Sequence, residues 1–98
     1  MISQDQIIEA VRKVASAKLG QASFEAVLTE PASDSEGREA VRITIVVRPG
    51  WVTKLEGNDL LDTLVEIRRK LQKLGEERFP LVGYATKQEL EQRGDSES

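Results

Sequence analysis

The chain has 98 residues, of which 39% are hydrophobic and 32% charged, and its formal net charge is −3. This length fits a single domain around one hydrophobic core, because two separate cores would each be too small to persist. The sequence has no cysteine and no histidine. Disulfides, thiolate catalysis and thiolate zinc sites are therefore excluded, and the side chain most often used for proton transfer near neutral pH is missing. The acidic balance argues against broad attraction to nucleic acid or anionic membranes.

The first segment is predicted to be an amphipathic helix. Ser3 and Gln6 have the spacing of a capping box at its start. Apolar side chains then recur with a helical period and polar ones fall on the opposite side. Gly20 follows the last apolar position and predicts the end of the helix, because glycine adopts the left-handed conformation at little steric cost.

Two strands are expected next. Residues Ala22–Glu30 and Ala40–Arg48 alternate apolar and polar side chains with a period of two. The segment Pro31–Glu39 between them is polar and rich in turn-forming residues, which predicts an antiparallel hairpin with a long, exposed and mobile loop. In this alternation Phe24 and Leu28 share a face that should be buried.

The second half predicts a helix, a short strand and a terminal helical segment. Asn58 or Asp59 can cap the helix, and Leu60, Leu64, Ile67, Leu71 and Leu74 give it an apolar stripe that Gly75 ends. Glu76–Pro80 is expected to be an exposed turn into a strand over Leu81–Ala85. Thr86 and Glu89 repeat the capping-box spacing, so one or two helical turns should follow before Gly94.

The expected fold is α+β, in the order α-β-β-α-β-α: a small single-layer antiparallel sheet, made of a hairpin and a short third strand, covered on one face by two helices. Residues 1–94 should form the domain and 95–98 a polar tail. The predicted core comprises Phe24, Leu28, Ile43, Ile45, Leu64, Ile67 and Leu71. The order of elements resembles the KH class of RNA-binding domains, although the GXXG loop of that class is absent.

Catalytic and cofactor motifs are not apparent. Glu56, Asp59 and Asp62 lie close together at a helix start, where carboxylates are explained by capping and by the helix dipole, with carboxylate chemistry as the rival explanation. No hydroxyl has a histidine base, and neither GxGxxG nor GxxxxGK[ST] is present. We therefore expect no enzyme activity, no cofactor and no metal.

Protein contact has better candidates. Leu61 and Val65 lie beside the main apolar stripe of the second helix and widen its apolar arc. Either the first helix covers this arc or a partner does. Trp51, followed by Val52, is the only tryptophan, and it can anchor a partner or close the open end of the core.

Basic residues offer an alternative. Arg42 and Arg48 project from one face of the second strand, and the second helix carries a basic stretch made of Arg68, Arg69, Lys70 and Lys73. Together these side chains offer a binding surface for an anion or RNA. Cations near a helix C-terminus are equally explained by the helix dipole, and few aromatic residues are present to stack bases.

These observations favour a non-catalytic protein-interaction module, a small accessory, inhibitory or antitoxin-like subunit that self-associates. Its expected partner-binding residues are Trp51, Val52, Leu61 and Val65. The alternative is a KH-like nucleic-acid-binding domain that uses the basic residues. No segment approaches the roughly 20 apolar residues that cross a bilayer, and a cytoplasmic location without membrane contact is expected.

Overall fold

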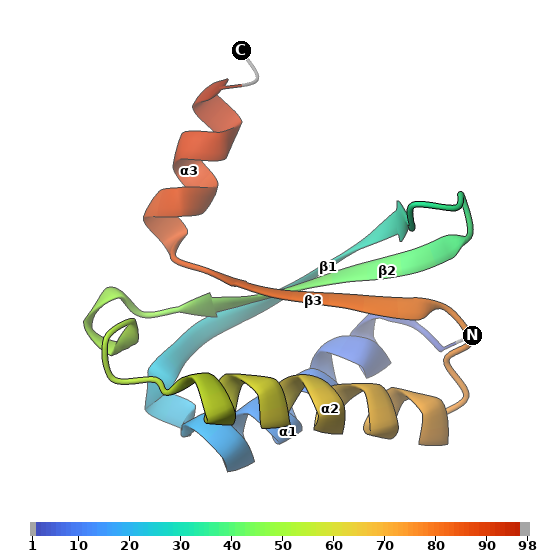
Figure 1. Cartoon of the computed structure of the whole chain (residues 1–98), viewed down its shortest axis with the longest axis horizontal. Helices are drawn as coiled ribbons and strands as arrows, with labels where there is room; N and C mark the ends of the chain where they lie inside the picture. Colours follow the sequence, from blue (N-terminus) through green and yellow to red (C-terminus); the bar gives the residue numbers. More distant parts are fainter. Residues whose placement is uncertain (1, 97–98) are drawn as a thin grey trace.

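The computed structural model describes residues 2–96 and contains a three-stranded sheet with two helices on one of its faces (Figure 1). A third helix, α3, projects from the opposite side of the sheet (Figure 1). The elements, in chain order, are α1 (Gln4–Leu19), β1 (Phe24–Ser33), β2 (Glu39–Val47), α2 (Gly57–Lys73), β3 (Phe79–Ala85) and α3 (Lys87–Ser96). The predicted order α-β-β-α-β-α is confirmed.

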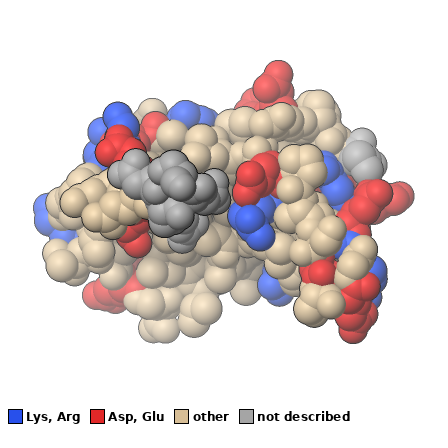
Figure 2. Space-filling view, turned by 90° about the horizontal axis from the view of Figure 1, so that it is seen from above, with Lys and Arg blue, Asp and Glu red and all other residues tan. Residues whose placement is uncertain are grey.

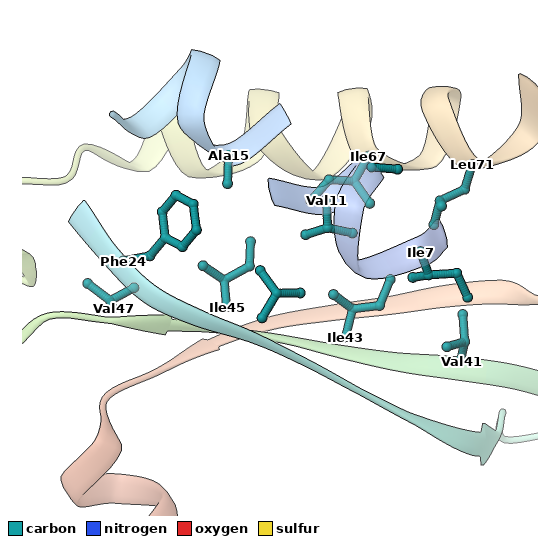
Figure 3. Close-up of a cluster of buried hydrophobic side chains, with 12 residues drawn as sticks. Ile7, Val11, Ala15, Phe24, Val41, Ile43, Ile45, Val47, Ile67 and Leu71 are labelled. Atoms are coloured by element: carbon teal, nitrogen blue, oxygen red, sulfur yellow. The ribbon is translucent and has the colours of Figure 1, made fainter. Parts of the chain in front are cut away.

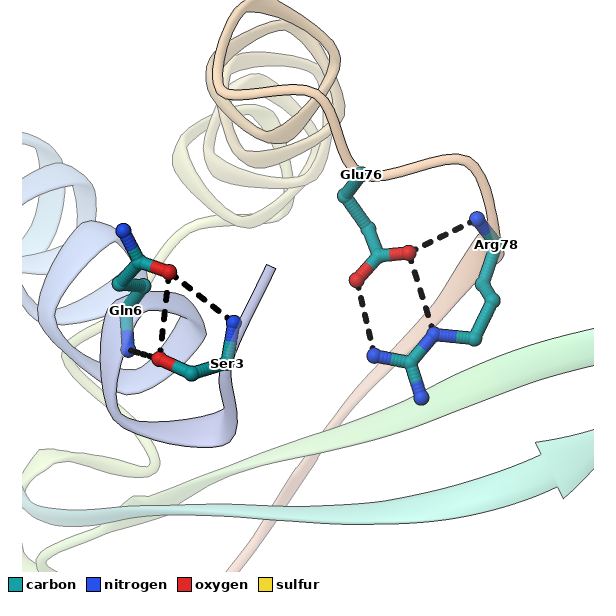
Figure 4. Close-up of polar contacts among 4 residues, drawn as sticks. All are labelled: Ser3, Gln6, Glu76 and Arg78. Carbon is teal, nitrogen blue, oxygen red and sulfur yellow. Dashed lines mark hydrogen bonds and ion pairs between the residues drawn. The ribbon is translucent and has the colours of Figure 1, made fainter. Parts of the chain in front are cut away.

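Both predicted capping boxes are present. At the start of α1, the backbone N–H of Gln6 donates to the Ser3 hydroxyl and the Ser3 N–H donates to the Gln6 side chain (Figure 4). At the start of α3, the Glu89 N–H donates to the Thr86 hydroxyl and the Thr86 N–H donates to the Glu89 carboxylate. Each box pairs two amides that a helix start would otherwise leave without partners.

Two predicted helix boundaries were wrong. Helix α2 begins at Gly57 after Glu56, and no side chain caps it, so Asp59 lies in its first turn instead of preceding it. Helix α3 continues through Gly94 to Ser96 instead of ending before that glycine. Glycine weakens a helix by about 1 kcal/mol but does not force its end.

The sheet is mixed, whereas the sequence predicted wholly antiparallel pairing. Strand β2 lies in the centre, antiparallel to β1 and parallel to β3. The reason is the connection. Helix α2 carries the chain back along the sheet, so β3 starts at the same end as β2, as in other strand–helix–strand units.

An irregularity in β1 changes which of its side chains are buried. Phe24 pairs with Val47 but Ala26 pairs with Val46, so the register shifts by one residue between Phe24 and Ala26. Such a bulge reverses the alternation of side chains that follows it. Val27 consequently enters the core with 5% exposure, and Leu28, predicted to be buried, is 47% exposed on the open face of the sheet.

The hairpin loop is shorter than predicted. Pro31 to Ser33 continue β1, Glu39 begins β2, and only residues 34–38 connect the strands. The Asp34 carboxylate accepts hydrogen bonds from the backbone N–H groups of Glu36 and Arg38 and from the Arg38 side chain, each at 2.9 Å. These hydrogen bonds, led by the one from the Arg38 backbone, lower the pKa of Asp34. The predicted bounds of the loop, Pro31–Glu39, were therefore wrong at both ends, whereas its predicted exposure is confirmed for residues 35–38.

The core lies between the sheet and the helices α1 and α2 (Figure 3). Of the predicted core residues, Phe24, Ile43, Ile45, Ile67 and Leu71 are buried. Leu64 is half-buried. Leu74, which was predicted on the apolar stripe but not in the core, is 42% exposed. Thr63 takes a buried place in α2 instead, because its hydroxyl donates to the Asp59 carbonyl at 2.7 Å and so needs no water.

Candidate interaction surface

One side of α2 carries apolar side chains that nothing in the described chain covers. Leu61 is 61% exposed and Val65 is 50% exposed. At about 100° per residue, both fall within one arc of the helix together with the half-buried Leu64 and with Arg68. We call these four residues the α2 flank. Helix α1 packs alongside α2 but leaves this flank exposed. Of the two alternatives that the sequence allowed, coverage of Leu61 and Val65 by the first helix is therefore wrong.

Strand β3 forms an edge of the sheet beside this flank. Within residues 2–96 it pairs with β2 alone. The backbone N–H of Arg48, just after β2, donates to the Ser23 carbonyl just before β1 at 3.0 Å. Since backbone groups of a strand point alternately to its two neighbours, the even-numbered residues of β2 face β1 and the odd-numbered residues face β3.

That alternation fixes which backbone groups of β3 point away from the sheet. Leu81 lies opposite Arg42. In a parallel ladder, the backbone of Leu81 therefore bonds to the residues on either side of Arg42. The backbone groups of Pro80, Val82 and Tyr84 then point away from β2. The position of Pro80 agrees, because proline has no N–H and is tolerated where that group would face solvent. We call the outward N–H and C=O groups of Val82 and Tyr84, with the Pro80 carbonyl, the β3 edge.

A hollow of about 430 Å³ lies along the β3 edge and the α2 flank. It is lined by β3, by Leu64 and Arg68 of α2, and by Arg42, Ile43 and Thr44 of β2. We call it the β3–α2 groove. Two contacts fix the helix against the strand here. The Tyr84 hydroxyl donates to the Leu60 carbonyl at 2.9 Å, and burial raises the pKa of that hydroxyl. The Arg68 guanidinium lies 4.7 Å from the centre of the Phe79 ring, a cation–π contact at the other end of the groove.

Trp51 and Val52 do not belong to the groove. Trp51 is half-buried and packs against the core, with the Lys54 ammonium 4.9 Å from the centre of its ring. The structure therefore favours the interpretation in which it closes an end of the core. Val52 is 53% exposed and lines a separate depression of about 130 Å³ with Leu60 and Tyr84.

Several of the basic side chains of the nucleic-acid alternative are paired with carboxylates. Arg42 lies 3.2 Å from Glu30, Arg48 lies 3.7 Å from Glu25, and Arg69 lies 3.0 Å from Glu66. Lys70 is half-buried and Lys73 is exposed in the last turn of α2.

The basic side chains also divide between two sides of the sheet. Ile43 is buried toward the helices, so its neighbour Arg42 faces the opposite side. The basic stretch of α2 belongs to the helix layer, although Arg42 and Arg68 both line the β3–α2 groove. On the sheet side away from α1 and α2, acidic and basic side chains lie next to one another (Figure 2).

The acidic residues at the start of α2 do not form a metal-binding cluster. In the part of the chain that the structure describes, no three or more acidic side chains are grouped so that they could hold a metal ion. Glu56, Asp59 and Asp62 are exposed. Nor is any helix in residues 2–96 long and apolar enough to cross a membrane.

One buried polar pair was missed by the sequence analysis. Glu76, expected in an exposed turn, is only 6% exposed, and its carboxylate accepts hydrogen bonds from the Arg78 guanidinium at 2.8 and 3.1 Å and from the Arg78 N–H at 2.9 Å (Figure 4). These bonds, chiefly those from the side chain, lower the pKa of Glu76 to about 2. The pair fixes the turn that leads from α2 into β3. The sequence did offer one signal for this pair: a charged residue, Glu76, directly follows the helix-ending Gly75.

Comparisons with protein-family models, with curated proteins and with solved structures each found no match.

Proposed function

We propose that this protein is a non-catalytic protein-interaction module, a small accessory or inhibitory subunit that binds its partner through the β3–α2 groove. The observation that supports this proposal is the open edge of β3 beside the exposed apolar side chains of the α2 flank. A strand edge offers a row of backbone hydrogen-bonding groups to an added strand, and a neighbouring apolar surface gives that strand something to bury.

The two edges of the sheet differ in a way that supports the choice of β3. The β1 edge carries a bulge, two glutamates at positions 25 and 30, and Pro31, all of which discourage pairing with another chain. The β3 segment FPLVGYA contains no charged residue, and Pro80 is its only protection. An edge left unprotected beside an apolar flank is typical of an edge that is covered in the working assembly.

Site-specific photo-cross-linking in the native host tests this proposal. A photo-reactive amino acid at position 61, in the α2 flank, should give a discrete protein adduct. The same amino acid at position 28, which is also apolar and exposed but lies on the open face of the sheet, is the matched control and should give none. Adducts to nucleic acid at either position would instead support the nucleic-acid-binding alternative. Protein adducts at position 28 alone would mean that the partner binds the open face of the sheet, which contradicts the proposal.

A further inference from the structure

We propose that the occupant of the β3–α2 groove is a second copy of this chain, related by a twofold axis that joins two β3 strands antiparallel into one six-stranded sheet. This inference rests on the proposed function and names the partner for the same surface. Three features of the described residues support it: the hydrogen-bonding pattern of the β3 edge, the place of the apolar flank along α2, and the distribution of charge along α2.

The β3 edge can pair fully with itself in one register. If the axis passes through Gly83, Val82 lies opposite Tyr84 of the other copy, and each of these residues both donates and accepts a backbone hydrogen bond. If the axis passed through Val82, Pro80 would lie opposite Tyr84 and would leave the Tyr84 carbonyl without a donor. Gly83 is exposed and has nothing within 4 Å of the position that a Cβ would occupy. The first register is therefore favoured.

The same axis brings the two α2 flanks together. The bond from Tyr84 to Leu60 and the contact of Arg68 with Phe79 show that α2 runs antiparallel to β3, with residues 61–65 level with the middle of the strand. A twofold axis through Gly83 therefore places Leu61, Leu64 and Val65 nearest the second copy. Apolar side chains at the centre of an interface contribute most to its stability.

Charge along α2 fits the antiparallel arrangement. Residues 57–66 contain three acidic residues and no basic residue, whereas residues 67–73 contain four basic residues and no acidic one. Two antiparallel α2 helices place the acidic half of each opposite the basic half of the other, while a parallel arrangement would place like charges together. At physiological salt, this charge complementarity stabilises a dimer less than apolar burial does. It nevertheless favours the antiparallel over the parallel arrangement of the two α2 helices.

Sedimentation equilibrium of the purified chain tests this inference. We expect a dimer, and we expect Val65→Asp to weaken it by at least about tenfold because a carboxylate would be buried at the apolar centre. Leu28→Asp, an equally drastic change on the open face, should leave the dimer intact. Amide exchange of Val82 and Tyr84 should slow as protein concentration rises. A monomeric wild type, or a dimer indifferent to Val65→Asp, overturns the inference.

Charge exchange gives a second test, in which each double variant is the rescuing partner of the other. Asp62→Lys with Glu66→Lys leaves Asp59 as the one acidic residue of α2 and makes the helix predominantly basic. Arg68→Glu with Arg69→Glu leaves Lys70 and Lys73 as its basic residues and makes the helix predominantly acidic. Each double variant alone should dimerise less tightly than the wild type, and an equimolar mixture should form a heterodimer. If the mixture remains monomeric while wild type dimerises, the antiparallel arrangement is wrong.

The outcome for the second copy is separable from that for the proposed function. If the purified chain is monomeric yet position 61 cross-links to a different protein in the host, the interaction module stands and self-association fails. If position 61 cross-links to a second copy of the chain, both are supported. If position 61 gives no protein adduct and the chain is monomeric, both fail.

Discussion

Glu76 and Arg78 form an ion pair that is largely shielded from water, with side-chain exposures of 0% and 15%. The geometry of α2 explains why the glutamate lies there. Gly75 has a φ of 93°, its N–H donates to Gln72, and the Glu76 N–H donates back to Leu71, which together form a Schellman ending. The chain therefore turns sharply after α2 and carries the Glu76 carboxylate inward, where Arg78 neutralises it. An arginine that is itself held by a buried carboxylate fixes the start of β3.

The stability of the fold should depend on the ionised form of Glu76. Its folded pKa of about 2 lies below the ordinary 4.5, so its stabilising effect is complete above pH 4.5 and is lost as the pH falls from 4.5 to 2. This difference corresponds to about 3 kcal/mol at most. We expect Glu76→Gln to lower the unfolding free energy by about that amount at pH 7, and the gap between variant and wild type to close over that acidic range. Denaturant unfolding at a series of pH values measures it.

A surface pair provides the control for this prediction. Glu9 and Lys13 lie 3.5 Å apart on α1 with exposed side chains, and pairs of this kind contribute well under about 1 kcal/mol. Glu9→Gln should therefore change the unfolding free energy little at any pH. If the two glutamine variants behave alike, the carboxylate of Glu76 is not the source of the acid sensitivity.

At the scale of elements, the bulge in β1 decides which side of the strand is buried. Val27→Ala should cost about 2 kcal/mol, because it removes buried methyl groups. Leu28→Ala removes a larger apolar side chain, yet it should cost less than about 1 kcal/mol because that side chain is half-exposed. Chemical denaturation of the two variants compares them directly. The reverse ranking would mean that the strand keeps a regular alternation and that the bulge is wrong.

The elements themselves were predictable from the sequence because their signals are local. The capping residues Ser3 and Thr86 and the alternating segment of β2 act over a few positions, and each was confirmed. The bulge, the parallel pairing of β3 and the tight loop at Asp34 depend on distant partners or on side-chain hydrogen bonds. A period of two cannot reveal the insertion of one residue in the middle of a strand.

The candidate surface was predictable only in part. The exposed apolar arc at Leu61 and Val65 follows from the helical period, and the structure leaves both side chains uncovered. The β3 edge could not be assigned, because the strand order of a sheet is set by the packing of the helices and is not visible in FPLVGYA. Trp51 was ambiguous in the sequence because an aromatic side chain in a loop suits both a core end and an interface.

At the scale of the whole molecule, the packing is uneven. Helices α1 and α2 each bury apolar side chains against the sheet, whereas α3 projects away from it (Figure 1). Over residues 87–92, Leu90 is the one side chain of α3 that is partly buried. Helices of this length without an apolar face are marginal in water.

Helix α3 should therefore open independently of the rest. We expect its backbone amides to exchange with solvent at least about 100-fold faster than those of α2 under native conditions. Native-state hydrogen exchange measured by NMR resolves the two helices. If the amides of α2 and α3 were equally protected from exchange, α3 would unfold together with the rest of the domain, and this prediction would be wrong.

The parallel pairing of β2 with β3 also sets an order of folding. Ala40 pairs with Phe79 across 39 positions of sequence, whereas the β1–β2 hairpin closes through a loop of residues 34–38. Because long loops close slowly and lose more entropy, the hairpin should form in the transition state and β3 should join afterwards. We expect Ile45→Ala to slow folding and Val82→Ala mainly to speed unfolding, as stopped-flow kinetics would measure. During synthesis, the side of β2 that pairs with β3 would stay unpaired until β3 has left the ribosome. For that interval, the edge most prone to aggregation would belong to β2, the strand that lies at the centre of the folded sheet.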